Sequence, residues 1–195
     1  RHLSITQGDQ AKALEKLSSG QRINRAADDA AGLSIAEGLR AQVNGYNVAA
    51  RNAQDGISVV QTAEGGLAEA QSILQRMRDL AVQGANDTNN DDSRQAITDE
   101  LAALGEELTR IAEGTNFNGI SLLSDTATDL AVQVGAGSDA ATNSITIDLS
   151  SQSLGATLAT LGTVAITDAD SATAAIDAID VALGEVYAAR SNLGA

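Results

Sequence analysis

Residues 39–67 read LRAQVNGYNVAARNAQDGISVVQTAEGGL, and this stretch decides the fold. Its apolar residues recur at alternating steps of four and three, which is the spacing of a coiled-coil seam on one long helix. Glu64 is the one polar interruption of this seam. The seam residues are Leu39, Val43, Tyr46, Ala50, Ala53, Ile57, Val60 and Leu67.

The helix that carries this seam is expected to be long. The chain contains no proline, so no proline ring clashes with a preceding turn and kinks a helix. Residues 30–85 would form a helix about 80 Å long at ~1.5 Å per residue. After Gly65-Gly66 the large apolar residues shift to Ile73, Met77 and Leu80, so we expect the seam to skip and the supercoil to relax there.

Two further helices are expected to pack on the first one. Residues 86–92 are rich in turn-forming side chains, so the next helix should lie antiparallel on the upper part of the first. Gly114 is expected to end that helix in the left-handed conformation. The three helices should share one core seam, formed by Leu39, Val43, Tyr46, Ile57, Val60, Leu67, Leu74, Leu101, Leu104, Leu108, Ile176, Ile179, Leu183 and Val186.

Polar side chains mark where each long helix should begin. Asp28 or Asp29 is expected to cap the first helix. Asp92 or Ser93 is expected to cap the second helix, and Ser171 the third. Each of these side chains can accept a hydrogen bond from an N–H group that the first helical turn leaves free.

A β-hairpin is expected between the second and third long helices. Apolar residues alternate with polar or small ones over residues 130–134 and again over 145–149, with a turn-rich segment between them. Residues 150–167 have only a weak period and are expected to form a loop or irregular strand. A short amphipathic helix is expected over residues 10–17.

The fold class that follows is mainly α, an elongated bundle of long coiled-coil-like helices with a small β-hairpin appendage. Aromatic residues make up 2% of the chain, so Ala, Leu, Ile and Val must fill the core, which suits closely packed helices. We expect four regions: a partial terminal helix and linker over 1–27, N-terminal core helices over 28–120, the hairpin and loop over 121–170, and a C-terminal core helix over 171–195.

Composition argues against several classes of partner. The formal net charge of −14 repels nucleic-acid phosphates and an anionic membrane surface, so neither is an expected partner. No apolar run approaches the roughly 20 residues that span a bilayer. Cysteine is absent, which excludes disulfides and thiolate metal sites.

Catalysis is not expected, and neither a cofactor nor a metal is. His2 is the only histidine, so the chain has no zinc-binding histidine pair and no Ser-His-Asp relay. The carboxylates that could act as an acid and base lie on helix faces away from the seams, in solvent. One alternative stays open: a carboxylate-dependent surface enzyme or carbohydrate-binding module, which would need a lined cleft near the hairpin. The carboxylates concerned are Asp99, Glu100, Glu106 and Glu107.

Six sequence blocks, in a fixed order, carry a family resemblance. The blocks are Leu17–Leu33 (LSSGQRINRAADDAAGL), Asn52–Ser58, Gln61–Gly65, Leu74–Gln83, Thr115–Gly119 and Ala188–Ala195. Through them the chain resembles bacterial flagellins. The resemblance implies a structural subunit of the flagellar filament, secreted by the flagellar export machinery to the extracellular flagellum and assembled with other flagellin subunits. A hook–filament junction protein, which shares the N-terminal blocks, is the alternative.

The resemblance also implies that both ends of the family's core are cut. The extreme N-terminal segment is shortened, and the lower half of the C-terminal core helix would follow Ala195. The expected partner of Leu39, Val43 and Tyr46 would lie in that half-helix, so we expect these three side chains to be exposed or to pair with another chain.

A polar stretch of the first long helix is the candidate recognition site. By itself it is compatible with an ordinary solvated helix face. Flagellins sensed by the vertebrate flagellin-specific Toll-like receptor carry an Arg, a Leu and a Glu that Arg76, Leu80 and Glu100 match, so the resemblance implies that this receptor is a partner. The same surface is expected to be buried between subunits in the filament. We call the following residues the ridge: Gln75, Arg76, Arg78, Asp79, Leu80, Gln83 and Glu100.

Overall fold

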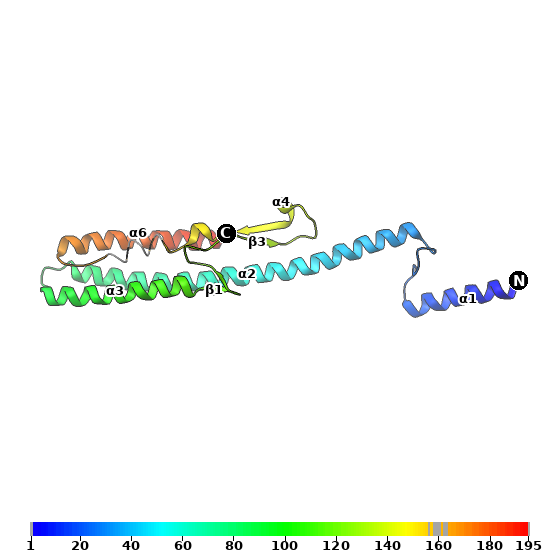
Figure 1. Ribbon diagram of the computed structural model, residues 1–195, viewed down its shortest axis with the longest axis horizontal. Helices are drawn as coiled ribbons and strands as arrows, with labels where there is room; N and C mark the ends of the chain where they lie inside the picture. The colour runs from blue at the N-terminus through cyan, green and yellow to red at the C-terminus, as the bar shows by residue number, and fades with distance from the viewer. Residues whose placement is uncertain (1, 156, 158–160, 162–163, 195) are drawn as a thin grey trace.

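The computed structural model describes residues 2–155, 157, 161 and 164–194. It is an elongated molecule built from long helices, with the N-terminal helix at one end of the long axis and a bundle of three helices at the other (Figure 1). The mainly α, elongated fold class is confirmed. The long helices are α1 (His2–Ser19), α2 (Ala30–Gly84), α3 (Asp91–Gly114) and α6 (Ala169–Leu193).

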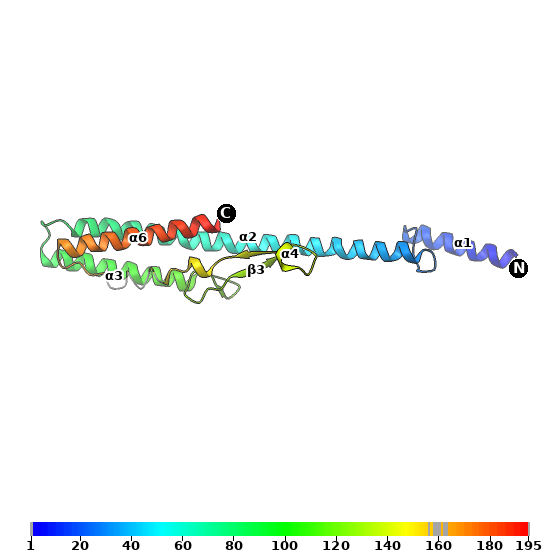
Figure 2. The same cartoon turned by 90° about the horizontal axis from the view of Figure 1, so that it is seen from above.

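Helix α2 has 55 residues and is the axis of the molecule. Asp29 caps its start, since its Oδ1 accepts a hydrogen bond of 2.8 Å from the backbone N–H of Gly32. The helix ends at Gly84, one residue before the predicted end. Glycine fits there because a Cβ atom at Gly84 would lie 2.9 Å from Cδ1 of Ile166. In both views α3 and α6 flank only the C-terminal part of α2 (Figures 1 and 2).

Helix α3 starts and ends differently from the prediction. Its N-cap is Asn90, whose side chain accepts a hydrogen bond of 2.9 Å from Ser93 N–H, so capping by Asp92 or Ser93 was wrong. Asn90 has the extended backbone that an N-cap requires, whereas the two residues after Asp91 are already helical. Gly114 is the last helical residue and is not left-handed, because Thr115 continues in an extended conformation into a strand.

Two small antiparallel strand pairs follow. Strands β1 (Asn116–Phe117) and β2 (Ile120–Ser121) form a tight hairpin that the sequence analysis did not predict. Its turn residues, Asn118 and Gly119, have φ values of 52° and 80°, which suits an Asn-Gly turn of type I′.

The second pair is the predicted β-hairpin. Strand β3 (Leu130–Gln133) pairs with β4 (Ser144–Ile147), and the short helix α4 (Ala140–Asn143) lies between them. The hairpin lies along α2: a Cβ at Gly56 would be 3.2 Å from Val132, and Asn52 Nδ2 donates a hydrogen bond of 3.0 Å to the Gln133 carbonyl.

Helix α6 begins with a capping box. Asp168 is the N-cap and accepts a hydrogen bond of 2.7 Å from Ser171 N–H, while Ser171 Oγ accepts one of 2.9 Å from Asp168 N–H. Ser171 is therefore the third helical residue and not the cap that we predicted. Before α6, the predicted loop over 150–167 starts with the 3₁₀ turn η1 (Ser150–Gln152); its residues 156, 158–160 and 162–163 lie outside the described residues.

The apolar stripe of α2 has its irregular step at Val59 to Leu67, slightly earlier than predicted. Val59, Ala63 and Leu67 are separated by two successive steps of four, after which Ala70 and Leu74 resume the three-four spacing. The prediction placed the shift after Gly65-Gly66 because it followed only large apolar residues, whereas small ones occupy half of the buried positions. The buried stripe consists of Val59, Ala63, Leu67, Ala70, Leu74, Met77, Ala81 and Gly84.

The expected core residues divide by their position along α2. Those near α3 and α6 are buried or half-buried, while those before the bundle are exposed, because no described segment except the β3–β4 hairpin covers α2 there. Ile57 is exposed because Gly56 faces the hairpin. Buried are Leu67, Leu74, Leu101, Leu108, Ile179, Leu183 and Val186; half-buried are Val60, Leu104 and Ile176; exposed are Leu39, Val43, Tyr46 and Ile57.

Candidate functional site

The ridge divides between two sides of α2. Arg76 and Arg78 are two residues apart, which points their side chains about 200° away from each other on an α-helix. Arg76 faces α3 and Arg78 faces α6. The exposed face of α2 between them carries Gln75, Asp79 and Gln83.

The structure places Glu100 of α3 beside Arg76. Arg76 Nε and Nη2 donate hydrogen bonds of 3.1 and 2.7 Å to Glu100 Oε1. The two side chains keep 57% and 45% of their surface exposed, so water and salt screen the pair and it adds little to stability. The pair therefore places an arginine and a carboxylate side by side on a face that a partner can reach.

Arg78 has a partner that sequence reasoning missed. Its Nε donates a hydrogen bond of 2.6 Å to Asp180 Oδ1, and its Nη2 donates one of 3.3 Å to Oδ2. These hydrogen bonds hold the pKa of Asp180 below its ordinary value and raise the pKa of Arg78. Beside this pair, an open groove of about 660 Å³ runs between α2 and α6, lined by Gln75, Arg78, Asp79, Asp180, Leu183, Gly184 and Tyr187.

Leu80 does not lie on the exposed surface of the ridge. Only 3% of its surface is accessible, and it belongs to the same core cluster as Met77 and Ile97. Leu80 and Arg76 are four residues apart, which puts them on one side of α2, but Leu80 is packed into the core cluster whereas Arg76 stays exposed. Leu80 therefore packs in the core, on the buried side of the exposed ridge residues.

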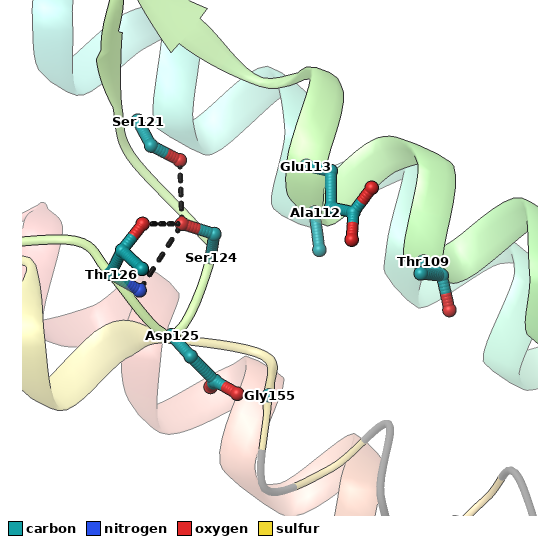
Figure 3. A pocket seen from close by; sticks show the side chains of 8 residues that line it. All are labelled: Thr109, Ala112, Glu113, Ser121, Ser124, Asp125, Thr126 and Gly155. Atoms are coloured by element: carbon teal, nitrogen blue, oxygen red, sulfur yellow. Dashed lines mark hydrogen bonds between the residues drawn. The ribbon is translucent and has the colours of Figure 1, made fainter.

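A hollow of about 520 Å³ lies between the end of α3 and the loop after β2 (Figure 3). Hydroxyl groups on one side bond to each other: Ser121 Oγ lies 2.7 Å from Ser124 Oγ, which lies 2.8 Å from Thr126 Oγ1. Glu113 and Asp125 supply the two carboxylates. Neither has a histidine near it, since the only histidine is in α1. The lining residues are Thr109, Ala112, Glu113, Ser121, Ser124, Asp125, Thr126 and Gly155.

The region under the β3–β4 hairpin is apolar. A cavity of about 350 Å³ there has no charged side chain in its lining, so it lacks the carboxylates that the enzyme alternative requires. Across the described ranges, no three His, Cys, Asp or Glu side chains are placed to hold a metal ion. The carboxylates Asp99, Glu100 and Glu106 are exposed, and Glu107 pairs with Arg110. The cavity is lined by Ala53, Gly56, Ile57, Val60, Gln61, Val132, Val134, Ile145, Ile147 and Leu193.

Two comparisons with known proteins agree with this geometry. Residues 1–128 match the family described as the bacterial flagellin N-terminal helical region. The whole chain is similar to the flagellin of Halalkalibacterium halodurans, at 51% identity over 195 residues, and covers 71% of that protein. The chain belongs to the bacterial flagellin family.

Two other flagellins show how far the likeness extends. The flagellin of Clostridium tyrobutyricum is 58% identical over 123 residues, which are 63% of this chain and 33% of that protein. The crystal structure of Bacillus cereus flagellin superposes with a TM-score of 0.63 at 33% identity, covering 74% of this chain and 81% of that one. The chain thus spans most of some flagellins and about a third of others.

Membership of the flagellin family supports a role as a structural subunit of the flagellar filament, which lies outside the cell. A flagellin is a structural protein, which is consistent with the expectation of no enzymatic activity. Among the residues that the structure describes, no helix combines the length and the hydropathy of a membrane span.

Proposed function

We propose that the chain assembles with further copies of itself into the flagellar filament through the apolar face of α2. One observation carries the proposal: Leu39, Val43 and Tyr46 are 57%, 58% and 59% exposed, and no described segment covers them. They keep the four-three spacing of a coiled-coil seam, which is suited to contact with another helix. A continuous exposed apolar face of this kind is typical of a docking surface.

The shape of the molecule suits an open polymer. Helix α1 and the three-helix bundle lie at opposite ends of a long axis (Figure 2), so the two ends present different surfaces. Contacts between unlike surfaces of successive copies generate a helical filament when the rotation does not close a ring. The filament is extracellular, and we infer that the chain is secreted to it by the flagellar export machinery.

Electron microscopy of the protein expressed from its complete gene tests the proposal. We expect regular tubes under polymerising conditions. The double variant Leu39→Ser, Val43→Ser should yield fewer filaments at unchanged helicity, because both side chains are exposed in the single chain. Val181→Ser is the matched control, since Val181 is 64% exposed on α6, away from this face. A protein that stays monomeric, or a double variant that assembles as well as its parent, would overturn the proposal.

Recognition by the host flagellin-sensing Toll-like receptor is a second candidate function. The observation that favours it is the Arg76–Glu100 pair on an exposed face, with Gln75, Asp79 and Gln83 beside it. Arginine is enriched among the residues that dominate binding energy at interfaces. In this proposal Leu80 acts by supporting the helix that carries Arg76.

Surface plasmon resonance with the receptor ectodomain tests this second function. Arg76→Ala and Glu100→Ala should each weaken binding by more than about five-fold, the change that marks an important interface residue. Arg51→Ala is the control, because Arg51 is an exposed arginine of α2 outside the ridge. If both ridge variants keep full helicity and bind like the parent, receptor recognition is refuted and the filament role stands.

A further inference from the structure

Polar side chains line the edge where α2 meets α6. On α2, Glu64, Gln71 and Arg78 follow one another at intervals of seven residues, which keeps them on one side of the helix. On α6, Asp180 pairs with Arg78 and Arg190 pairs with Gln71. These contacts also show that the two helices are antiparallel, since a later residue of α6 meets an earlier residue of α2.

Arg190 lies between two possible partners. The Arg78–Asp180 pair shows the register of the two antiparallel helices. Arg190 lies ten residues after Asp180, so it lies beside the position ten residues before Arg78, which is position 68 of α2. At ~1.5 Å per residue, Gln71 is then about 4.5 Å away along the axis in one direction, and Glu64 about 6 Å away in the other. An arginine side chain is long enough to reach either of them.

The contact with Gln71 leaves Arg190 incompletely bonded. Its Nη1 donates a hydrogen bond of 2.5 Å to Gln71 Oε1. Its Nε is buried and has no hydrogen-bond partner among the described residues. A buried donor without an acceptor costs stability, because it has given up water and gained nothing in exchange. The observed contact therefore leaves one donor of this guanidinium without an acceptor in the described part of the chain.

Glu64 is within reach of the same turn of α6. A Cβ atom at Gly194 would lie 3.9 Å from Glu64 Oε1, and Gly194 N–H donates a hydrogen bond of 3.1 Å to the Arg190 carbonyl. The Glu64 carboxylate thus lies one helical turn from Arg190. Neither residue takes part in the ion pairs that the described residues form.

We propose that Arg190 has two alternative partners on α2, Gln71 and Glu64, and that exchange between them forms a two-state latch between α2 and α6. In the Gln71 state a single neutral acceptor is used. In the Glu64 state both carboxylate oxygens face the guanidinium, so Nε and one Nη can each donate to a charged acceptor. Neither filament assembly nor receptor contact requires this exchange, so the inference goes beyond the proposed function.

A double-mutant cycle between Glu64→Gln and Arg190→Gln tests the latch. The cycle is measured by urea unfolding in the parent and again in the Gln71→Leu background, where the first partner is removed. We expect the coupling between Glu64 and Arg190 to change the unfolding equilibrium constant less than about two-fold in the parent and about five-fold with Gln71→Leu, as a partly exposed ion pair would. Raising the salt concentration should reduce the second value.

A spectroscopic readout separates the latch from a merely structural role of Arg190. In ¹⁵N NMR spectra, the Arg190 Nε–H signal should shift and exchange more slowly with water in Gln71→Leu, because Nε then donates to Glu64. Gln71→Ala serves if Gln71→Leu unfolds. The matched control is Glu107→Gln, which breaks the Arg110 pair on α3 and should leave the Arg190 signal unchanged. Equal coupling in the two backgrounds, or an unshifted Nε–H signal, would overturn the proposal.

Discussion

Truncation of Leu80 tests whether this ridge residue is part of the buried core. Leu80 is 3% exposed, so Leu80→Ala removes three buried apolar carbon groups, worth about 2.4 kcal/mol at roughly 0.8 kcal/mol each. The space left behind adds a cavity penalty, and measured Leu→Ala changes in cores cost about 2–5 kcal/mol. We therefore expect the free energy of unfolding to fall by about 3 kcal/mol. A surface role alone would leave it nearly unchanged.

The assay is urea unfolding followed by circular dichroism, with the slope against urea concentration checked for constancy. Val82→Ala is the control, because Val82 lies two residues away on the same helix and is 49% exposed. A loss below about 1 kcal/mol for Leu80→Ala, or one equal to the Val82→Ala loss, would refute the buried position of Leu80. Receptor binding of Leu80→Ala should be measured only where the variant is still folded.

Three further predictions concern the rest of the molecule. Amides of residues 39–46 should exchange with solvent faster than those of 67–74, as measured by hydrogen-exchange mass spectrometry, because α3 and α6 cover only the second segment; equal rates would contradict this. The pKa values of Asp168 and Asp180 are lowered by hydrogen bonds from Ser171 and Arg78, so each carboxylate stabilises the fold above the pKa of an unfolded Asp and loses this effect as pH falls through its folded pKa. Asp168→Asn and Asp180→Asn should accordingly lower Tm at neutral pH and match the parent in acid, and a Tm difference that persists in acid would argue otherwise. Gly84→Ala should destabilise the bundle by about 1–3 kcal/mol through overlap with Ile166, whereas Gly65→Ala, with nothing within 4 Å, should stabilise it by about 0.5–1 kcal/mol in the same urea titration.

Large apolar side chains made most of the fold predictable. Their spacing identified α2 to within one residue at its C-terminal end, and their alternation identified the strand pair in which Val132 faces Ile145. Alanine and glycine are where the prediction failed, because their presence at Ala70 or Gly84 says nothing about burial until a neighbouring helix is in place. Helix caps failed for a similar reason. Asn90 and Ser93 are equally good caps by chemistry, and only the backbone angles distinguish them.

The candidate site was predictable only where its parts are close in sequence. Arg76 and Glu100 are joined by one short turn, so antiparallel packing of α2 and α3 was enough to bring them together. Arg78 and Asp180 are 102 residues apart, and their meeting depends on the register of α6 against α2. That register follows from the packing of the whole core. The burial of Leu80 depends on the same packing. Its spacing from Arg76 therefore could not show that Leu80 lies in the core and not on the exposed ridge.

The pairing of α2 with α6 also sets an order of events in folding. Helices α2 and α3 are neighbours along the chain, so their contacts require only a short loop to close. Contacts between α2 and α6, such as Arg190 with Gln71, join residues 119 positions apart and carry a larger loop-closure entropy. Leu67 and Leu74 belong to one buried cluster that also includes Ile179 and Val186 of α6. A growing chain therefore cannot complete this core until α6 has been synthesised, and until then part of the apolar surface of the α2–α3 pair stays open to water.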